Sequence, residues 1–317
     1  MGRICVLLIL LILIVPAYGA KKPLPTLITH WENSSMQYKI KKKYFRQEAF
    51  SSWDKNFFDQ HLLPKTTINY RNSSGSVPGS CLSNLIEGLV KELRESKDNF
   101  QDFTLLKGIE FNKKQFAGCI VLKFKDHPFI LKLFVENPYS FLHPENKGFR
   151  HGCMAVISGG INRFLAGFNR IKNLEITQNL LQQKKQPITI DFPRKWFWKP
   201  ENSRWFFVKG IDFKESFTLR LPEMYGIVSD EIVSDASIHH IHKHYGSQIF
   251  KICKSIDFRL DPNIKNYRLE KKTNTLVAID TEYFPELLGV KHKIDSDNYF
   301  FLHLRIGYKV VRDRFFL

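Results

Sequence analysis

Apolar residues recur at helical spacing in one stretch of the first hundred residues. In residues 81–96, CLSNLIEGLVKELRES, the apolar positions fall three and four residues apart, at Leu82, Leu85, Ile86, Leu89, Val90 and Leu93. Positions with this spacing lie on one face of a helix, and the charged residues are left for the other face. The pattern therefore predicts an amphipathic helix that buries one side.

From residue 103 onward the pattern changes to that of β-strands. The stretches FTLLKGIEF, GCIVLKFKD and PFILKLFVE occupy residues 103–111, 118–126 and 128–136. Short runs rich in β-branched and aromatic residues are typical of strands. Little more than an Asp126-His127 turn separates the last two runs, and so short a connection favours a hairpin.

The second half of the chain alternates between helical and strand patterns. The expected elements are a helical stretch over 151–183 with a weak point at Gly159-Gly160, strands over 188–192 and 205–213, a helix over 227–256 and a β-hairpin within 261–284. The segment FPRKWFWKP at 192–200 is aromatic and basic. Aromatic strand packing is favoured there over stacking on nucleobases or contact with lipid. The order of elements indicates an α+β fold.

The first twenty residues are expected to be a signal peptide outside the fold. Arg3 precedes an apolar run from Cys5 to Val15, Pro16 ends that run, and small residues such as Gly19 follow it. This is the order that a signal peptidase reads. The run is shorter than the roughly 20 residues of a membrane span, which favours a cleaved signal over an uncleaved anchor. We therefore expect export, to a periplasm, the extracellular space or a secretory lumen.

The charge of the chain indicates an anionic partner. Lys and Arg number 48 against 31 Asp and Glu, a formal balance of +17, while 43% of the residues are hydrophobic. The apolar share is enough for a sizeable core, and the basic excess attracts phosphorylated ligands, nucleic acid or a lipid surface. No motif for specific nucleic-acid recognition accompanies this charge, so phosphorylated ligands and anionic surfaces are the partners that we expect.

Cysteine and histidine spacing gives little indication of zinc. Cys81, Cys119, Cys153 and Cys253 are scattered without a C-x-x-C pair, so the sequence allows either free thiols or one or two disulfides in an oxidising compartment. In HHIHKH, at 239–244, His240 and His244 share a helix face at the spacing of a two-histidine site. The glutamate of H-E-x-x-H is missing, which favours a solvated basic face over metal binding.

The C-terminal hairpin carries the strongest chemical signal. Asp261 and Asn266 stand at the entrance of its first strand, and Asp280 stands at the exit of its second. Entrance and exit are neighbours in an antiparallel hairpin, so three oxygen-bearing side chains are expected to converge. Oxygen ligands without Cys or His suit Mg²⁺ or Mn²⁺ rather than zinc.

This arrangement resembles the catalytic core of the protein-kinase-like superfamily, nearer to aminoglycoside and choline kinases than to typical protein kinases. Asp261-Pro-Asn-Ile-Lys-Asn266 has the Asp-x4-Asn spacing of the catalytic loop, and a hairpin then leads to Asp280 in IDTE. Upstream, Phe129-Ile130-Leu131-Lys132 is similar to the Val-Ala-Ile-Lys strand. The stretch WFFVKGIDF resembles the fifth strand and hinge of that family.

The resemblance implies a two-lobed fold over residues 101–317, with an antiparallel-sheet N-lobe and a reduced helical C-lobe. Residues 21–100 are expected to form an N-terminal extension that contains the amphipathic helix. In the cofactor site, Lys132 would hold the phosphates of ATP, and the backbone of Val208 and Gly210 would bind its adenine.

The resemblance also implies a catalytic residue and a metal site. Asp261 would accept the proton of a substrate hydroxyl, while Asn266 and Asp280 would hold Mg²⁺ or Mn²⁺ with Glu282 as an auxiliary ligand. The helix carboxylate that pairs with the strand lysine has Glu175 as its nearest candidate.

The function indicated is an exported kinase-like phosphotransferase that moves the γ-phosphoryl group of ATP to a hydroxyl of an unidentified substrate. Two departures from the family favour an alternative, a catalytically inactive pseudokinase that binds a nucleotide or a protein partner. Gly108 and Gly118 are too far apart for a compact Gly-rich loop, and no helix glutamate is an obvious partner for Lys132. Arg259-Leu260-Asp261 also replaces the His-Arg-Asp of the family. A third hypothesis is a basic exported binding protein for anionic ligands.

Overall fold

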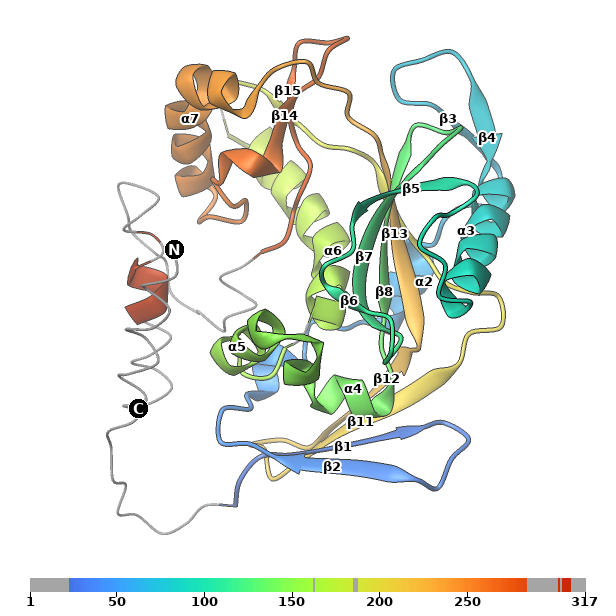
Figure 1. Ribbon diagram of the computed structural model, residues 1–317. Coiled ribbons are helices and arrows are strands. Elements are labelled where there is room, and N and C mark those ends of the chain that lie inside the picture. The colour runs from blue at the N-terminus through green and yellow to red at the C-terminus, as the bar shows by residue number, and fades with distance from the viewer. Residues whose placement is uncertain (1–22, 162, 185–187, 284–301, 303, 309–317) are drawn as a thin grey trace.

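The computed structural model describes residues 23–161, 163–184, 188–283, 302 and 304–308, and the expected signal peptide lies outside them. Within these residues the fold is a mixed α+β arrangement in which antiparallel sheets are flanked by helices (Figure 1). The α+β class predicted from the sequence is confirmed.

The largest sheet has six strands, and all its pairings are antiparallel. Its strands, in spatial order, are β10 (Lys195–Trp198), β13 (Met224–Asp230), β8 (Phe129–Val135), β7 (Ala117–Phe124) and β5 (Phe103–Lys107), with β6 (Phe111–Asn112) also paired to β7. The predicted hairpin of β7 and β8 is present, with Lys123 opposite Ile130. Strand β8 occupies the middle of the sheet, which is why its sequence is an apolar run interrupted by Lys132 alone.

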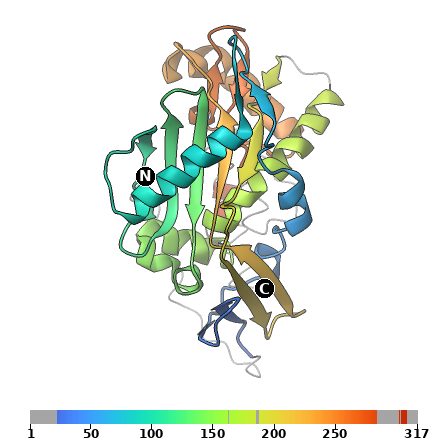
Figure 2. The same cartoon turned by 90° about the vertical axis from the view of Figure 1, so that its right-hand side faces the viewer.

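Two helices cover this sheet, one on each face. Helix α3 (Gly79–Arg94) lies across one face (Figure 2), where its buried leucines, isoleucine and valine join a cluster with the side chains of β7 and β8. The amphipathic helix predicted from the apolar spacing is thus confirmed. Helix α6 (Arg163–Gln182) packs against β7 and β8 from the other face (Figure 1). Any polar side chain that points from α6 toward the strands is therefore buried.

A glycine pair separates α6 from the helix before it, α5 (Phe149–Ile157), as the sequence predicts. Gly159 and Gly160 have φ values of +74° and +103°, a region that L side chains rarely adopt. A Cβ atom on Gly160 would also lie 2.7 Å from the ring of Phe45. Both the backbone turn and the close approach require glycine here.

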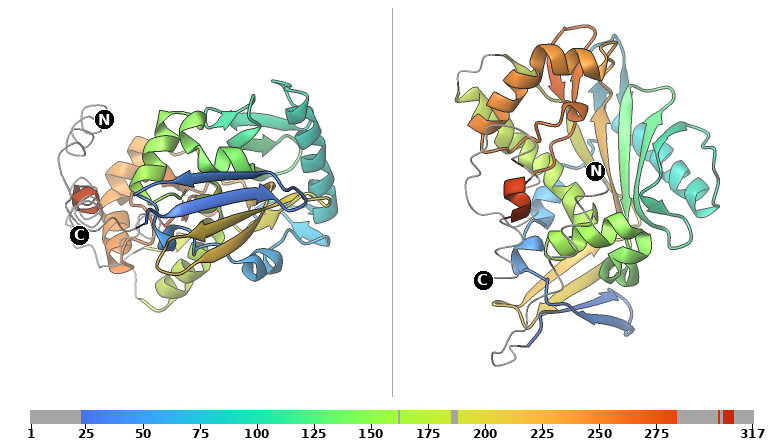
Figure 3. Two further views of the ribbon diagram at one scale, coloured as in Figure 1. Left: turned by 90° about the horizontal axis from the view of Figure 1, so that it is seen from below. Right: turned by 60° about the vertical axis from the view of Figure 1, so that its left-hand side comes forward.

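A second sheet of four strands joins the first described residues to a later segment of the chain, residues 205–222. It contains β12 (Phe217–Pro222), β11 (Trp205–Ile211), β1 (Thr26–Trp31) and β2 (Gln37–Lys41), which form one layer in Figure 3. Because β1 pairs with β11 from Thr26 opposite Ile211 to Trp31 opposite Phe206, the residues expected to form an N-terminal extension share a sheet and a core with the rest of the fold.

The C-terminal part of the described chain has its own hydrophobic cluster. Helix α7 (Ile238–Ser255) packs against the hairpin of β14 (Tyr267–Leu269) and β15 (Leu276–Ala278), and β9 (Ile190–Asp191) adds to β15 in parallel. The predicted hairpin is confirmed. Tyr267 and Leu276 are buried in this cluster together with Leu174 near the end of α6, so α6 connects the cluster to the large sheet.

Short elements complete the described fold. They are η2 (Gln47–Ala49), α2 (Lys55–Gln60), β3 (Thr67–Asn69), β4 (Ser76–Pro78), α4 (Pro138–Leu142), η3 (Pro144–Lys147) and η4 (Ile264–Asn266). Among the residues described, no helix combines the length and the apolar content that crossing a bilayer requires.

The helix predicted over 227–256 begins later than expected. Residues 224–230 form strand β13, which is paired on both sides and almost entirely buried, and α7 starts only at Ile238. The run MYGIVSD lacks the polar positions of an amphipathic helix because both of its faces are covered. The aromatic segment 192–200 contributes β10, as expected from strand packing.

Ser237 fixes the start of α7. Its side-chain oxygen accepts a hydrogen bond from the backbone N–H of His240 at 3.1 Å. We expect Ser237→Ala to lower the free energy of unfolding by about 0.5–2 kcal/mol, because that N–H loses its cap. Urea denaturation measures the change. Ser80→Ala, at an exposed position of α3, serves as the control and should stay within about 0.5 kcal/mol of wild type; equal losses in the two variants would contradict the capping role.

Cys81, Cys119, Cys153 and Cys253 are free thiols in the structure. Burial raises the pKa of Cys119 to about 11 and the pKa of Cys253 to about 12. Both thiols are therefore protonated at neutral pH and behave as small apolar groups in the core.

Candidate functional site

The hairpin brings its acidic and amide residues to one end, as the sequence predicts. Tyr267 pairs with Ala278, and the N–H of Ile279 donates to the carbonyl of Asn266 at 2.8 Å. Asp261 precedes this end: one carboxylate oxygen accepts from the Asn263 N–H at 2.9 Å, and the other accepts from the Asn266 amide at 3.0 Å. The loop is therefore held by the side chain of Asp261 itself.

Lys132 reaches the same end of the hairpin from the middle of the large sheet. Its Nζ lies 3.2 Å from Oδ2 of Asp280, so two residues that are 148 positions apart form an ion pair. The Lys132 side chain is 22% exposed and that of Asp280 is 26% exposed. Both side chains thus keep part of their surface exposed, whereas the strand and the hairpin beneath them are largely buried.

Asn173, on α6, ties the two loops of the hairpin end together. Its side-chain amide donates to the carbonyl of Arg259 at 2.7 Å and to that of Thr281 at 2.9 Å, and its oxygen accepts from the Arg259 guanidinium at 3.3 Å. The residue is fully buried. Because Arg259 lies just before Asp261 and Thr281 just after Asp280, one side chain sets the distance between the two acidic residues.

Arg170 lies one turn earlier on the same face of α6 and contacts both carboxylates that follow the hairpin. Its Nε donates to Oδ1 of Asp280 at 3.0 Å, and its Nη2 donates to Oε2 of Glu282 at 2.5 Å. Arg163, at the start of α6, adds a contact of 3.4 Å to the same oxygen of Glu282. The Arg170 side chain is only 6% exposed.

Lys195, on β10, is a buried lysine beside the loop that carries Asp280. Its Nζ donates to Oγ1 of Thr281 at 2.8 Å, and this hydroxyl donates to the backbone carbonyl of Arg170 at 2.6 Å. Burial lowers the pKa of Lys195 to about 7, and repulsion from Lys132 acts in the same direction. A large part of the Lys195 population is therefore uncharged at neutral pH.

Asp280 is ionised despite its surroundings. Burial by itself raises the pKa of its carboxyl group, but the charges of Arg170, Lys132 and Lys195 outweigh burial and hold the pKa well below its usual range. Burial likewise disfavours the charged form of Arg170, and the carboxylates of Asp280 and Glu282 reverse this and raise its pKa. The carboxylates and the cations of the cluster thus each favour the charged form of the other.

The proposed metal ligands do not fit Mg²⁺ or Mn²⁺ in this arrangement. Both oxygens of Asp280 contact cationic nitrogens of Arg170 and Lys132, and Oε2 of Glu282 contacts two guanidinium groups. The amide nitrogen of Asn266 donates to Asp261, which leaves its amide oxygen as the one group of the proposed set without a cationic contact among the described residues. Divalent ions require several oxygens free of competing cations. Within the described part of the chain, no group of three or more His, Cys, Asp or Glu side chains is arranged to hold a metal ion.

Val208 and Gly210, expected to contact adenine, lie in the four-stranded sheet and not beside Lys132. Val208 is fully buried in the core, and Gly210 packs against the ring of Phe217. Their strand β11 pairs with β1 and β12, whereas β8 pairs with β7 on one side and with β13 on the other, where Ile227 is opposite Lys132. The sequence of β11 resembles that of a hinge strand, but the later strand that pairs with β8 is β13.

Glu175 has a different partner from the one expected. Its carboxylate lies 2.7 Å from Nε2 of His61, and its side chain is 46% exposed. Helical periodicity explains the difference, since Arg170 and Asn173 are three residues apart on the face toward the hairpin, and Glu175 is on another face. The position facing Asp280 is thus occupied by an arginine.

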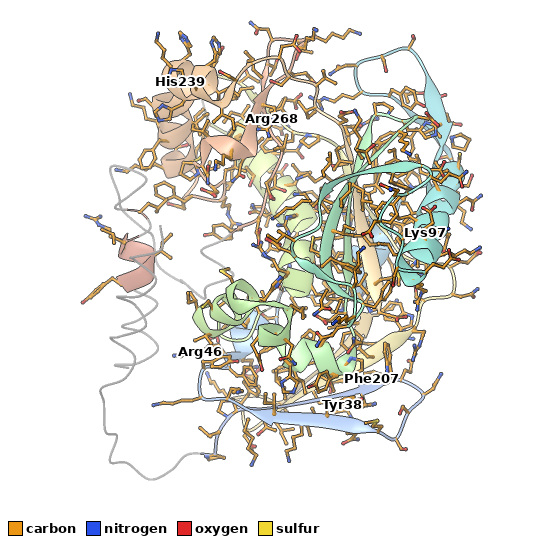
Figure 4. All side chains as sticks on the ribbon, in the orientation of Figure 1. Tyr38, Arg46, Lys97, Phe207, His239 and Arg268 are labelled. Carbon is orange, nitrogen blue, oxygen red and sulfur yellow. The ribbon has the colours of Figure 1, made fainter. Side chains whose placement is uncertain are left out.

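The two histidines of α7 form a pair at the surface. The ring centroids of His240 and His244 are 4.5 Å apart, and both residues are exposed. The neighbouring His239 points outward from the same end of α7 (Figure 4). This end of the helix matches the solvated basic face that the sequence favours.

Sequence reasoning did not identify Arg170, Asn173 or Lys195. A signal was present for the first two: Arg170, Asn173 and Thr177 follow one another at spacings of three and four along α6, and all three are buried. Polar residues at this spacing form a stripe on one helix face, and burial of such residues requires partners. Lys195 had no comparable signal within its aromatic segment.

Comparisons of this chain with models of protein families, with curated proteins and with solved structures found no match. The function is therefore argued from the site alone.

Proposed function

We propose that this chain is a kinase-like protein that binds the phosphates of a nucleotide beside Lys132. The observation that carries the proposal is the 3.2 Å contact between Lys132 Nζ and Asp280 Oδ2. A lysine from the middle strand of an antiparallel sheet beside an aspartate that follows a hairpin is the arrangement that kinases use at the phosphates. The exposure of both side chains gives a ligand access.

The arrangement of elements is consistent with two lobes. The large sheet with α6 would form the N-lobe, since α6 lies between β8 and β10 in sequence and packs on β7 and β8. Helix α7 with the hairpin would form the reduced C-lobe, with its separate hydrophobic cluster. The nucleotide would lie between them, and the adenine pocket, if the kinase arrangement holds, would be bordered by β13.

One candidate activity is transfer of the γ-phosphoryl group of ATP to a hydroxyl. Asp261 would accept the hydroxyl proton as the oxygen attacks phosphorus, ADP would leave, and Lys132 would offset negative charge on the phosphates. The hydrogen bonds from Asn263 and Asn266 to Asp261 support this role, because they orient its carboxylate. The substrate would be an exported or extracellular hydroxyl compound if residues 1–20 direct export.

The second candidate is nucleotide binding without transfer, and the contacts of Arg170 favour it. Arg170 engages both Asp280 and Glu282, the carboxylates expected to hold the metal that phosphoryl transfer normally requires. We therefore conclude that nucleotide binding is the function best supported, with a protein partner or an anionic surface as the downstream target of this basic chain.

Thermal stability with and without nucleotide tests the proposed function. ATP at about 100 times its Kd should stabilise the wild-type chain by about 2.7 kcal/mol, raising Tm. Lys132→Met should abolish that increase. Lys209→Met, at an exposed position of β11 in the other sheet, should keep it. If no adenine or guanine nucleotide raises the Tm of the wild type, the proposal is wrong.

ATP turnover separates the two candidate activities. If the chain transfers phosphate, it should release ADP in the presence of Mg²⁺ or Mn²⁺, and Asp261→Asn should abolish release while the ATP-induced increase in Tm remains. If the chain only binds, the wild type should show the increase in Tm without ADP release above the rate of buffer alone. Circular dichroism of each variant confirms that it folds.

A further inference from the structure

Arg170 occupies the centre of the site. Its guanidinium bridges Asp280 and Glu282 at 3.0 and 2.5 Å, and its carbon Cζ lies 5.8 Å from the centre of the Phe134 ring. A guanidinium that spans two carboxylates from one loop sits where a divalent ion bound by the same two carboxylates would have to sit. It is also permanently charged, because its pKa is far above neutral pH in any protein environment.

The third nitrogen of this guanidinium lacks an acceptor. Nη1 of Arg170 is buried and has no hydrogen-bond partner among the described residues. A buried N–H without a partner costs free energy, and protein structures rarely leave one unless another molecule supplies the acceptor. Lys132 and Asp280, both partly exposed, border the same cluster. We expect a phosphate oxygen that enters beside them to supply the acceptor that Nη1 lacks.

The charges around Arg170 favour an anion over a cation. Lys132, Arg163, Arg170 and Lys195 surround Asp280 and Glu282, and the further carboxylate of Glu110 lies 3.5 Å from Arg163. A divalent ion would have to break the contacts of Arg170 and then remain close to several positive charges. A phosphate would instead place its negative charge beside the cationic groups of Lys132, Arg163 and Arg170.

We propose that Arg170 takes the place of a divalent cation at Asp280 and Glu282, so that the site binds the phosphates of a nucleotide without Mg²⁺. The inference rests on the proposed nucleotide-binding function and specifies how that site works. Nη1 of the guanidinium offers its N–H groups to a phosphate oxygen, and the two carboxylates hold the guanidinium in position through Nε and Nη2. The expected ligand is a free nucleoside di- or triphosphate rather than its magnesium complex.

Isothermal titration of the wild-type chain with ATP, once in EDTA and once in excess MgCl₂, is the direct test. The Kd in EDTA should be equal to or lower than the Kd in MgCl₂, and adenosine without phosphates should not bind. If binding in EDTA is more than about tenfold weaker, a difference of ~1.4 kcal/mol, then Mg²⁺ contributes to the site and the inference is overturned.

Arg170→Gln tests whether the guanidinium supplies the affinity. In EDTA its Kd for ATP should rise at least about tenfold. Arg94→Gln, a half-exposed arginine on α3 at the opposite face of the sheet, should bind as the wild type does. Unchanged ATP binding in Arg170→Gln would overturn the inference. If this variant does not fold by circular dichroism, the wild-type comparison between EDTA and MgCl₂ decides the question without it.

The two proposals fail in different ways in the same titrations. ATP binding that requires MgCl₂ overturns the metal-free site and leaves the proposed nucleotide-binding function standing. Absence of ATP and ADP binding in both buffers overturns both proposals.

Discussion

Asp280→Asn is expected to lower the free energy of unfolding by about 3–5 kcal/mol at neutral pH. The substitution keeps the size of the side chain but removes the charge that balances Arg170, which is 6% exposed, and Lys132. Arg170 keeps its contact with Glu282, but one carboxylate then faces the charges of both Arg170 and Lys132 in a medium that solvates them poorly. Losses of about 3–5 kcal/mol are typical when one partner of a buried ion pair is removed. Urea denaturation monitored by circular dichroism measures the change.

The matched control is Asp235→Asn. Asp235 also pairs with a lysine, Lys271, but both side chains are more than 60% exposed, at 66% and 63%. Exposed pairs contribute little because water and salt screen them, so this variant should stay within about 1 kcal/mol of wild type. Equal effects of the two substitutions would show that the charge of Asp280 has no special role in stability.

The loss in Asp280→Asn should depend on pH in the acid range. The folded-state pKa of Asp280 lies well below that of the unfolded chain, which is about 3.9 for an aspartate. The stabilisation by its charge is therefore complete at neutral pH, and it declines once the pH falls below the unfolded-state value toward the folded-state pKa. The difference between wild type and variant should be constant near neutrality and shrink below about pH 4. A difference that does not change on acidification would indicate a packing effect.

Asn173→Leu is expected to lower the free energy of unfolding by roughly 2–6 kcal/mol and to weaken nucleotide binding. The two side chains are of similar size, but leucine leaves the buried carbonyls of Arg259 and Thr281 without the donor at 2.7 and 2.9 Å. Each unsatisfied buried group costs about 1–3 kcal/mol. Because these carbonyls belong to the two loops that carry Asp261 and Asp280, their separation should also relax.

Asn179→Leu is the control for this substitution. Asn179 lies on the same helix but is exposed, so its replacement should change the free energy of unfolding by no more than about 0.5 kcal/mol. Denaturation gives the stability of both variants, and the ATP-induced increase in Tm gives their binding. Full ATP binding by a destabilised Asn173→Leu would mean that Asn173 stabilises the fold without positioning the site.

Local pattern was sufficient for the elements whose two faces differ. Helix α3 was predicted because its buried leucines alternate with exposed charges at helical spacing, and the hairpin of β7 and β8 was predicted from two apolar runs and a short turn. The C-terminal hairpin was found in the same way. In each case the pattern that predicts the element lies within the element itself or in the turn beside it.

Pattern failed where burial surrounds an element or where pairing is long-range. The pattern of strand β13 predicts the start of a helix because neither of its faces is polar. The sequence of β11 resembles a hinge strand, but β11 pairs with β1, which is almost two hundred residues away. Local pattern does not show whether β11 or β13 pairs with β8. The pairing of β13 with β8 depends on contacts between distant parts of the chain.

The sequence by itself determined the candidate residues of the site: a strand lysine, an Asp-x4-Asn loop and an aspartate after a hairpin, because spacing within a strand and a hairpin fixes where side chains converge. The contact of Lys132 with Asp280 agrees with that expectation. Only the tertiary structure decided what surrounds them. It placed Arg170, from a helix more than a hundred residues earlier, between Asp280 and Glu282. Which side chain of α6 faces the hairpin depends on how the helix packs, and local pattern does not specify this.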